Sequence, residues 1–215
     1  MTDIAGFITQ LSIWALPTIL AIILHEVMHG VVARGFGDDT AERAGRLTLN
    51  PLAHIDPFGT IIMPLILIFL HLPVFGYAKP VPVNFFRLQP RRLGMIVVAA
   101  AGPVTNLILA FFSAWAMRAL VARASGQFGS EIFIPLAYMA RASVMINVFL
   151  AVFNLLPLLP LDGGRVLAGL LPSSLARGFA RLEPYGFLIL MLLLYTQAIN
   201  PIIYPAVNAL TQALL

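Results

Sequence analysis

The sequence has no cysteine, and only 10% of its 215 residues are charged. The absence of cysteine excludes disulfide bonds and thiolate metal ligands, so any zinc ion must be held by His, Asp or Glu side chains. Soluble domains carry about 25% charged residues, whereas this chain is 60% hydrophobic. The composition therefore indicates an integral membrane protein without a separate soluble domain, and we expect residues 1–215 to form one membrane-embedded domain.

Net charge is also small, at +4. In a membrane protein Lys and Arg mark cytoplasmic loops. We therefore attribute the excess of positive charge to such loops and expect no nucleic-acid partner. A helix needs about 20 apolar residues to cross a bilayer core of ~30 Å. The stretches that predict spanning helices are 7–33, 93–122, 132–159 and 184–199. The fold class is therefore an all-α polytopic membrane helical bundle, with an external N-terminus and a short external loop at 124–131.

Two segments do not fit a pattern of simple crossings. Residues 58–77 are apolar but interrupted by Pro64, His71 and Pro73, and basic residues occur on both sides of them. Because a single crossing cannot return to the side it left, we expect a re-entrant or broken segment; the alternative is an ordinary spanning helix. The tail 200–215 forms either a half-helix or a short final span.

The most polar segment, residues 34–57, is predicted to be a loop. Within it, RLTLN at 46–50 alternates apolar and polar residues in the manner of a short strand. Asn50-Pro51 then predicts a turn.

The most informative stretch is LHEVMHG at 24–30, which places His25, Glu26 and His29 inside an apolar run. Ionisable groups at that depth are costly and mark a functional site by default. On a helix, His25 and His29 stand one turn apart on one face and can reach the same ion, with Glu26 beside them. HExxH on a helix is a zinc signature in which the Glu is the general base. We therefore predict a catalytic zinc site.

Catalytic zinc usually has three protein ligands and keeps a fourth position for water. The best third candidate is Asp162 in PLLPLDGGR, because it ends an apolar run and is followed by two glycines that let the backbone turn. Alternatively, Asp162 caps a helix that begins near Arg165.

Two other histidines are rival ligands. His54 lies in the polar loop, where pairing with Asp56 is the expected alternative. His71 lies in the interrupted apolar segment, where a lone histidine is more often simply hydrogen-bonded.

HEVMHG in a membrane helix, followed far downstream by FNLLPLLPLDGGR, resembles the site-2 protease family of intramembrane zinc metalloproteases. That family carries HExxH in one span and N-x-x-P-x-x-P-x-D-G in a later one. The second pattern is matched here by Asn154, Pro157, Pro160, Asp162 and Gly163. The stretches AGPVTN, GRLTLNPLAHIDPFGT and FGYAKPVPVN also resemble short prokaryotic members that consist of little more than the membrane core. The core motifs lie within residues 20–170.

This resemblance implies that His25, His29 and Asp162 bind one catalytic Zn²⁺ and that Glu26 activates water. It also implies that Asn154 lies near the metal, where it positions the substrate or stabilises the oxyanion. Larger members add a PDZ or CBS domain, which is not found in this sequence, so we do not expect such a domain to gate the substrate.

The predicted function is hydrolysis of peptide bonds in or near transmembrane segments of membrane-protein substrates. The alternative is a metal-binding membrane protein, either a transporter or an inactive scaffold, without protease activity. The presence of Glu26 argues against that alternative, because a site that only binds a metal does not need a glutamate beside its ligands. We expect a multi-pass protein of a prokaryotic cell membrane, with the bilayer and a transmembrane substrate as partners and the active site towards the cytoplasm.

A substrate helix must unwind before its backbone can be cut, so we expect an extended segment of this chain to pair with it. The candidates are 46–50 and KPVPVN at 79–84. Two prolines leave 79–84 few amide donors, which favours 46–50.

Overall fold

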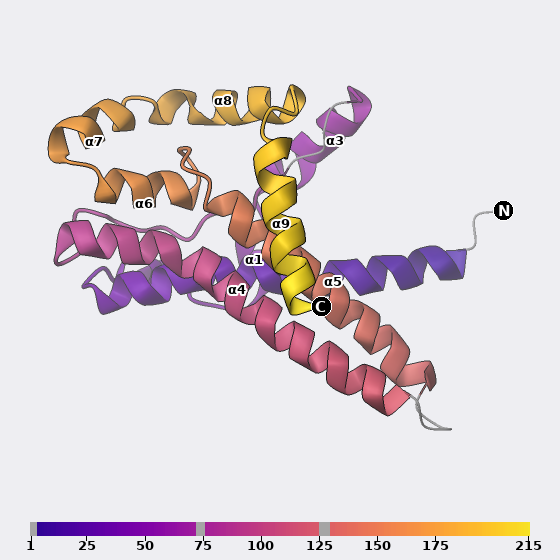
Figure 1. The fold of residues 1–215 in the computed structure, drawn as a ribbon. Helices are drawn as coiled ribbons and strands as arrows, with labels where there is room; N and C mark the ends of the chain where they lie inside the picture. The colour runs from indigo at the N-terminus through magenta and orange to yellow at the C-terminus, as the bar shows by residue number, and fades with distance from the viewer. Residues whose placement is uncertain (1–3, 72–75, 125–129) are drawn as a thin grey trace.

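Three long helices form the frame of the protein (Figure 1). The computed structural model describes residues 4–71, 76–124 and 130–215. The long helices are α1 (Ile4–Gly35), α4 (Arg91–Ala124) and α5 (Ser130–Asn154). Each is long and apolar enough to cross a membrane, and every regular element in the described ranges is helical. The prediction of an all-α membrane bundle is confirmed, whereas most of the predicted external loop, residues 125–129, lies outside the described residues.

Small side chains let these three helices approach closely. The face of α4 that is buried against α1 and α5 carries Ala99, Gly102, Ala110 and Ala114. Such residues allow backbones to pack tightly in a bilayer, where the hydrophobic effect does not drive helices together. A polar contact fixes how α4 and α5 are aligned along their lengths, since the Ser113 and Ser143 hydroxyls lie 2.8 Å apart.

The remaining helices are short. They are α2 (Thr40–Arg43), η1 (Pro51–His54), η2 (Pro57–Ile62), α3 (Met63–Phe69), α6 (Asp162–Leu170), α7 (Ser173–Ala180), α8 (Glu183–Tyr195) and α9 (Asn200–Leu214).

The C-terminal part differs from the predicted straight span at 184–199. Helix α8 has only 13 residues, and it joins α7 at a bend of 65°, so the pair forms a broken span or a re-entrant loop. Helix α9 packs its Ile203 into a core shared with Phe153 of α5 and Leu190 of α8. The tail is therefore helical, and at about 22 Å it is shorter than the bilayer core.

The two ends of the segment 58–77 lie next to each other. The Tyr77 N–H donates to the Gly59 carbonyl at 3.1 Å, and the Thr60 hydroxyl donates to the Tyr77 carbonyl at 3.0 Å. The helical part of the segment, formed by η2 and α3, covers only Pro57–Phe69. Because residues at its two ends are hydrogen-bonded to each other, the segment does not make a single crossing, which agrees with the predicted re-entrant or broken segment.

Buried and paired aspartates fasten the polar loop to the chain after residue 77. Asp38 is almost fully buried and accepts from the Asn84 N–H at 2.6 Å. Asp39 pairs with Arg43 and Arg87, each at 2.6 Å. Desolvation raises the pKa of Asp39, but the hydrogen bond from Arg43 and the charges of both arginines outweigh it and lower that pKa. These contacts hold the segment 77–89 against the polar loop 34–57, which the sequence predicts to face the cytoplasm.

The RLTLN segment at 46–50 is not a strand. In the described ranges it has no ladder partner and runs as an irregular loop. Its anchor is Arg46, whose guanidinium donates to the Lys79 carbonyl at 2.8 Å. Residues 46–48 are half-buried and residues 49–50 are exposed, so burial does not alternate along the segment as it would on a strand.

Candidate metal centre

Helix α1 presents the HEVMH residues to the interior of the bundle. His25 and His29 are one turn apart and are only 6% and 8% exposed. Their Nε2 atoms lie 3.1 Å from each other, which places both imidazoles on one face of α1, as the sequence predicts.

The facing helix α4 leaves room for these imidazoles because it has no side chain there. A Cβ atom on Gly102 would lie 2.5 Å from both His25 Cε1 and His29 Nε2. Real Cβ atoms do not approach other atoms that closely, so any larger residue at 102 would displace the histidines.

The third group comes from the start of α6. Asp162 is the first residue of this helix, and its Oδ2 lies 3.1 Å from His25 Nε2 and 3.3 Å from His29 Nε2. The following glycines make this position possible, since a Cβ at Gly163 would collide with the Leu155 carbonyl and one at Gly164 with the Leu159 amide. The structure therefore brings together the three residues that the sequence singled out as ligands.

Hydrogen bonds on the far side of each ring fix which nitrogen carries a proton. His29 Nδ1 lies 2.7 Å from the Val98 carbonyl, which can only accept, so Nδ1 carries the hydrogen. His25 Nδ1 lies 2.6 Å from Asn106 Oδ1, which is likewise an acceptor. In the neutral imidazoles both Nε2 atoms therefore present lone pairs to Asp162.

With both imidazoles neutral, three acceptor atoms meet with no hydrogen between them. Asp162 Oδ2 is buried and has no hydrogen-bond donor among the described residues. A buried anionic oxygen facing two lone pairs is unfavourable unless a cation lies between them. Zinc ligands at ~2.0 Å in a tetrahedron lie about 3.3 Å apart, and the observed separations are 3.1 to 3.3 Å. The donor set and its spacing fit Zn²⁺.

Two asparagines that the sequence reasoning did not assign hold His25 in place. Asn106 donates from Nδ2 to Asn147 Oδ1 at 2.8 Å, so its own oxygen is turned towards His25. Asn147 in turn donates to the Ser143 carbonyl at 2.9 Å. Both amides are fully buried. The available signal was an asparagine in the interior of each of two apolar helices, although the sequence could not show that the two side chains meet.

Removing the amide of Asn106 tests this network. For Asn106→Leu we expect zinc affinity to fall about 10- to 100-fold, the usual cost of losing an outer hydrogen bond to a ligand, measured by competition with a chromogenic chelator. Thr105→Val is the matched control, because the Thr105 hydroxyl bonds only to the Ala101 carbonyl of its own helix. Equal affinities of the two variants would contradict this role.

Glu26 is held by the segment that follows the re-entrant loop. Its Oε2 accepts from the Val81 N–H at 2.8 Å, and Glu26 itself is half-buried. Val81 stands between Pro80 and Pro82, so it is the one amide donor of this tripeptide. The contact leaves the other carboxylate oxygen of Glu26 available for chemistry.

A cavity of about 1020 Å³ contains this centre. Its walls come from α1, residues 76–85, α4, α5, α6 and α8, and they include His25, Glu26, His29, Asn154 and Asp162. Asn154 donates from Nδ2 to the Leu150 carbonyl at 3.0 Å. The cavity is mostly apolar around this polar centre, with side chains such as Phe153 and Leu190 in its walls.

The rival histidines lie elsewhere. His54 is buried, and its Nε2 lies 2.9 Å from the Thr48 carbonyl. The suggested pairing of His54 with Asp56 is wrong, because among the described residues His54 Nδ1 has no hydrogen-bond partner, and Asp56 accepts from the Gly59 N–H at 2.7 Å. His71 ends the α3 turn with a positive φ of 53°. Neither histidine is among the residues around the cavity.

Comparison with known proteins agrees with this arrangement. The family model of Peptidase family M50 matches residues 119–195. "Putative zinc metalloprotease YwhC" of Bacillus subtilis is 40% identical over 201 residues, covering 89% of this chain and 84% of the relative. "Putative zinc metalloprotease Rip2" of Mycolicibacterium smegmatis is 32% identical over 93% of this chain and 71% of the relative. No solved structure matches the chain.

The chain belongs to peptidase family M50, the site-2 protease family of zinc metalloproteases. The printed names of both relatives give zinc as the metal of those proteins. Together with its three apolar helices, family membership makes it a multi-pass membrane protein.

Proposed function

We propose that the protein is an intramembrane zinc endopeptidase, in which His25, His29 and Asp162 hold the metal. The observation that carries this proposal is the meeting of three potential ligand atoms, 3.1 to 3.3 Å apart, beside Glu26 in a cavity. A structural zinc site would be closed by a fourth protein ligand. Here the described residues supply three ligands and a carboxylate suited to proton transfer.

His25, His29 and Asp162 would hold a zinc ion that lowers the pKa of a water molecule and polarises the scissile carbonyl. Glu26 takes a proton from that water and delivers it to the leaving amine. The Val81 N–H keeps one oxygen of Glu26 fixed, so the proton moves through the other. Asn154, at the edge of the same cavity, positions the substrate or stabilises the oxyanion through its amide.

The substrate strand lies along residues 80–83. These residues line the cavity of the centre, whereas 46–50 do not, so the preference for 46–50 as the pairing segment is replaced. Pro80 and Pro82 have no N–H and the Val81 N–H is used by Glu26, so residues 80–82 receive the substrate through their carbonyl oxygens. An unwound substrate supplies the free N–H donors that such carbonyls need.

Replacing Val81 by proline removes the one N–H that Glu26 accepts. We expect turnover of a transmembrane substrate to fall about 10-fold, because a positioned general base that loses its orientation loses part of a 10²- to 10⁴-fold contribution. Zinc content should not change. Val81→Ala keeps the N–H and should cleave at nearly the wild-type rate. A Val81→Pro variant with wild-type turnover would show that this hydrogen bond does not position Glu26.

The active site faces the cytoplasm of a prokaryotic cell. Arg34 ends α1 about 8 Å beyond His29 along the helix. Arg91 and Arg92 begin α4, and Arg92 donates to the Gly169 carbonyl at the end of α6. Basic residues therefore cluster at the end of the bundle nearest the centre, which the positive-inside rule assigns to the cytoplasm.

Reconstituted liposomes distinguish this function from metal transport. The purified chain, in vesicles that contain a model transmembrane substrate and a zinc-sensing dye, should cleave the substrate without carrying zinc into the lumen. Zinc uptake without cleavage would assign the centre to a transporter. Zinc binding with neither activity, for a panel of substrates with different helix-breaking residues, would assign it to an inactive scaffold.

A further inference from the structure

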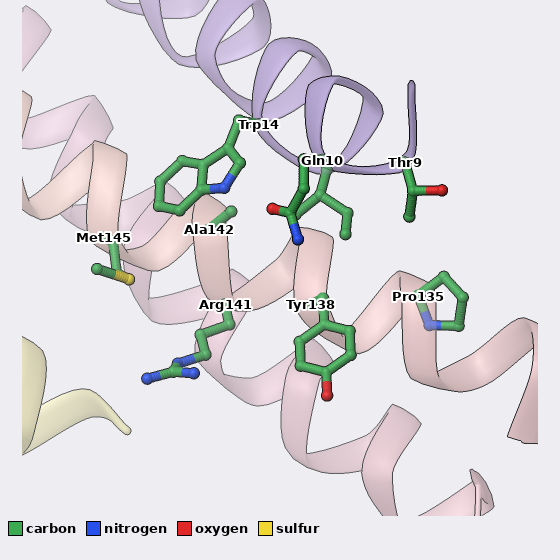
Figure 2. A pocket seen from close by; sticks show the side chains of 9 residues that line it. Thr9, Gln10, Trp14, Pro135, Tyr138, Arg141, Ala142 and Met145 are labelled. Atoms are coloured by element: carbon green, nitrogen blue, oxygen red, sulfur yellow. The ribbon is translucent and has the colours of Figure 1, made fainter. Parts of the chain in front are cut away.

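A second cavity lies between α1 and α5, away from the metal centre. Its volume is about 540 Å³. In Figure 2, Gln10 and Trp14 of α1 lie opposite Tyr138 and Arg141 of α5. Gln10 precedes His25 by 15 residues, about 22 Å along the helix, so this cavity is not an extension of the catalytic one.

The two tryptophans of the chain place this cavity at a membrane interface. Trp14 precedes Arg34 in α1 by 20 residues, about 30 Å, and Trp115 follows Arg92 in α4 by 23 residues, about 34 Å. These lengths match the bilayer core of ~30 Å. Tryptophan is enriched where the core meets the headgroups. Both residues therefore mark the interface opposite the basic end of the bundle.

Arg141 lies at the same level. Helices α4 and α5 run in opposite directions, and the hydroxyls of Ser113 and Ser143 meet at 2.8 Å. This register places Arg141, two residues before Ser143, opposite Trp115, two residues after Ser113. Its guanidinium is therefore at the depth of the lipid phosphates rather than at the centre of the bilayer.

Within the described ranges, no carboxylate of the protein pairs with this guanidinium. Arg141 is exposed, and among residues 4–71, 76–124 and 130–215 it has no carboxylate partner. Arg118, on the same side of the bundle, is occupied by the Leu214 carbonyl at 2.7 Å. A charge in a membrane segment is rare without a partner or a function, and the anion present at this depth is phosphate.

We propose that the cavity binds the phosphodiester headgroup of a membrane phospholipid. Arg141 offers a planar fork of N–H donors that suits phosphate oxygens. Tyr138, one turn before Arg141 on the same face, and Trp14 supply a hydroxyl and an indole N–H at the rim. Ile13 and Met145 provide the apolar wall along which an acyl chain lies.

Native mass spectrometry of the delipidated full chain tests this site. Titration with phosphatidylglycerol should give one adduct that survives collisional activation, and Arg141→Gln should weaken its binding about 10-fold. Arg141→Lys keeps the charge without the fork and should be intermediate. Arg123→Gln is the matched control, because Arg123 is exposed at the same side of the bundle but outside the cavity.

The lipid assignment also predicts two negative results. Diacylglycerol with the same acyl chains has no phosphate and should not form the adduct, and inorganic phosphate should not displace phosphatidylglycerol. Equal binding of diacylglycerol, displacement by phosphate, or unchanged affinity in Arg141→Gln would each overturn the proposal. So would an Arg141→Gln variant that binds phosphatidylglycerol normally but loses substrate cleavage, since that result would assign the cavity to a peptide.

Discussion

Replacement of Glu26 by glutamine should lower the cleavage rate about 10³-fold while leaving the zinc content unchanged. Glutamine keeps the size of the side chain and can still accept from the Val81 N–H, but it cannot take a proton from water. General base catalysis contributes about 10² to 10⁴ in rate. The rate is measured on a transmembrane substrate in proteoliposomes, and zinc is measured by mass spectrometry of the same preparation.

Glu42→Gln is the control for this experiment. Glu42 pairs with Arg34 at 3.0 Å on the surface, and an exposed pair contributes about 0–1 kcal/mol to stability. Its variant should therefore cleave like the wild type. If Glu26→Gln cleaved as fast as the wild type, Glu26 would not be the base. If it lost its zinc, Glu26 would be a ligand or a structural support.

Asp162→Asn should remove zinc without unfolding the chain. The amide keeps the shape of the carboxylate but loses the charge that faces two imidazole lone pairs, 3.1 and 3.3 Å away. Loss of an outer partner costs about 10- to 100-fold in metal affinity, so loss of a direct ligand should cost more than 100-fold. Affinity is measured by chelator competition, and folding by thermal unfolding in detergent.

Asp39→Asn shows whether loss of a carboxylate alone has this effect. Asp39 is paired with Arg43 and Arg87 in the polar loop, away from the cavity. Its variant should keep wild-type zinc affinity and activity. Retention of zinc by Asp162→Asn would place the third ligand elsewhere, and His54→Ala and His71→Ala would then be the next variants to measure.

The local part of the site could be predicted from the sequence because it depends on helix periodicity. Residues four apart on a helix share a face, which is enough to pair His25 with His29. Asp162 was the best third candidate from its place at the end of an apolar run before two glycines, and the ordered second pattern of the family then singled it out. Its physical basis appears only in the structure, where Gly163 and Gly164 let α6 start against the end of α5.

The cross-helix contacts could not be predicted in this way. Asn106 contacts both His25 and Asn147 because three helices pack at particular heights relative to one another. The periodicity of a single helix carries no information about those heights. The same holds for the bond between Glu26 and Val81, which requires the re-entrant segment to return. The alternation at 46–50 was misleading because it is not matched by alternating burial: residues 46–48 are half-buried and residues 49–50 are exposed.

The most direct test of the account is to map the bond that the purified chain cuts in a transmembrane substrate. Mass spectrometry of the products should place the cut within or next to the apolar segment. A chelator should abolish the cleavage, and one equivalent of Zn²⁺ should restore it. Cleavage that persists in chelator, or a zinc-loaded chain that cuts only in soluble loops far from the membrane, would contradict the account.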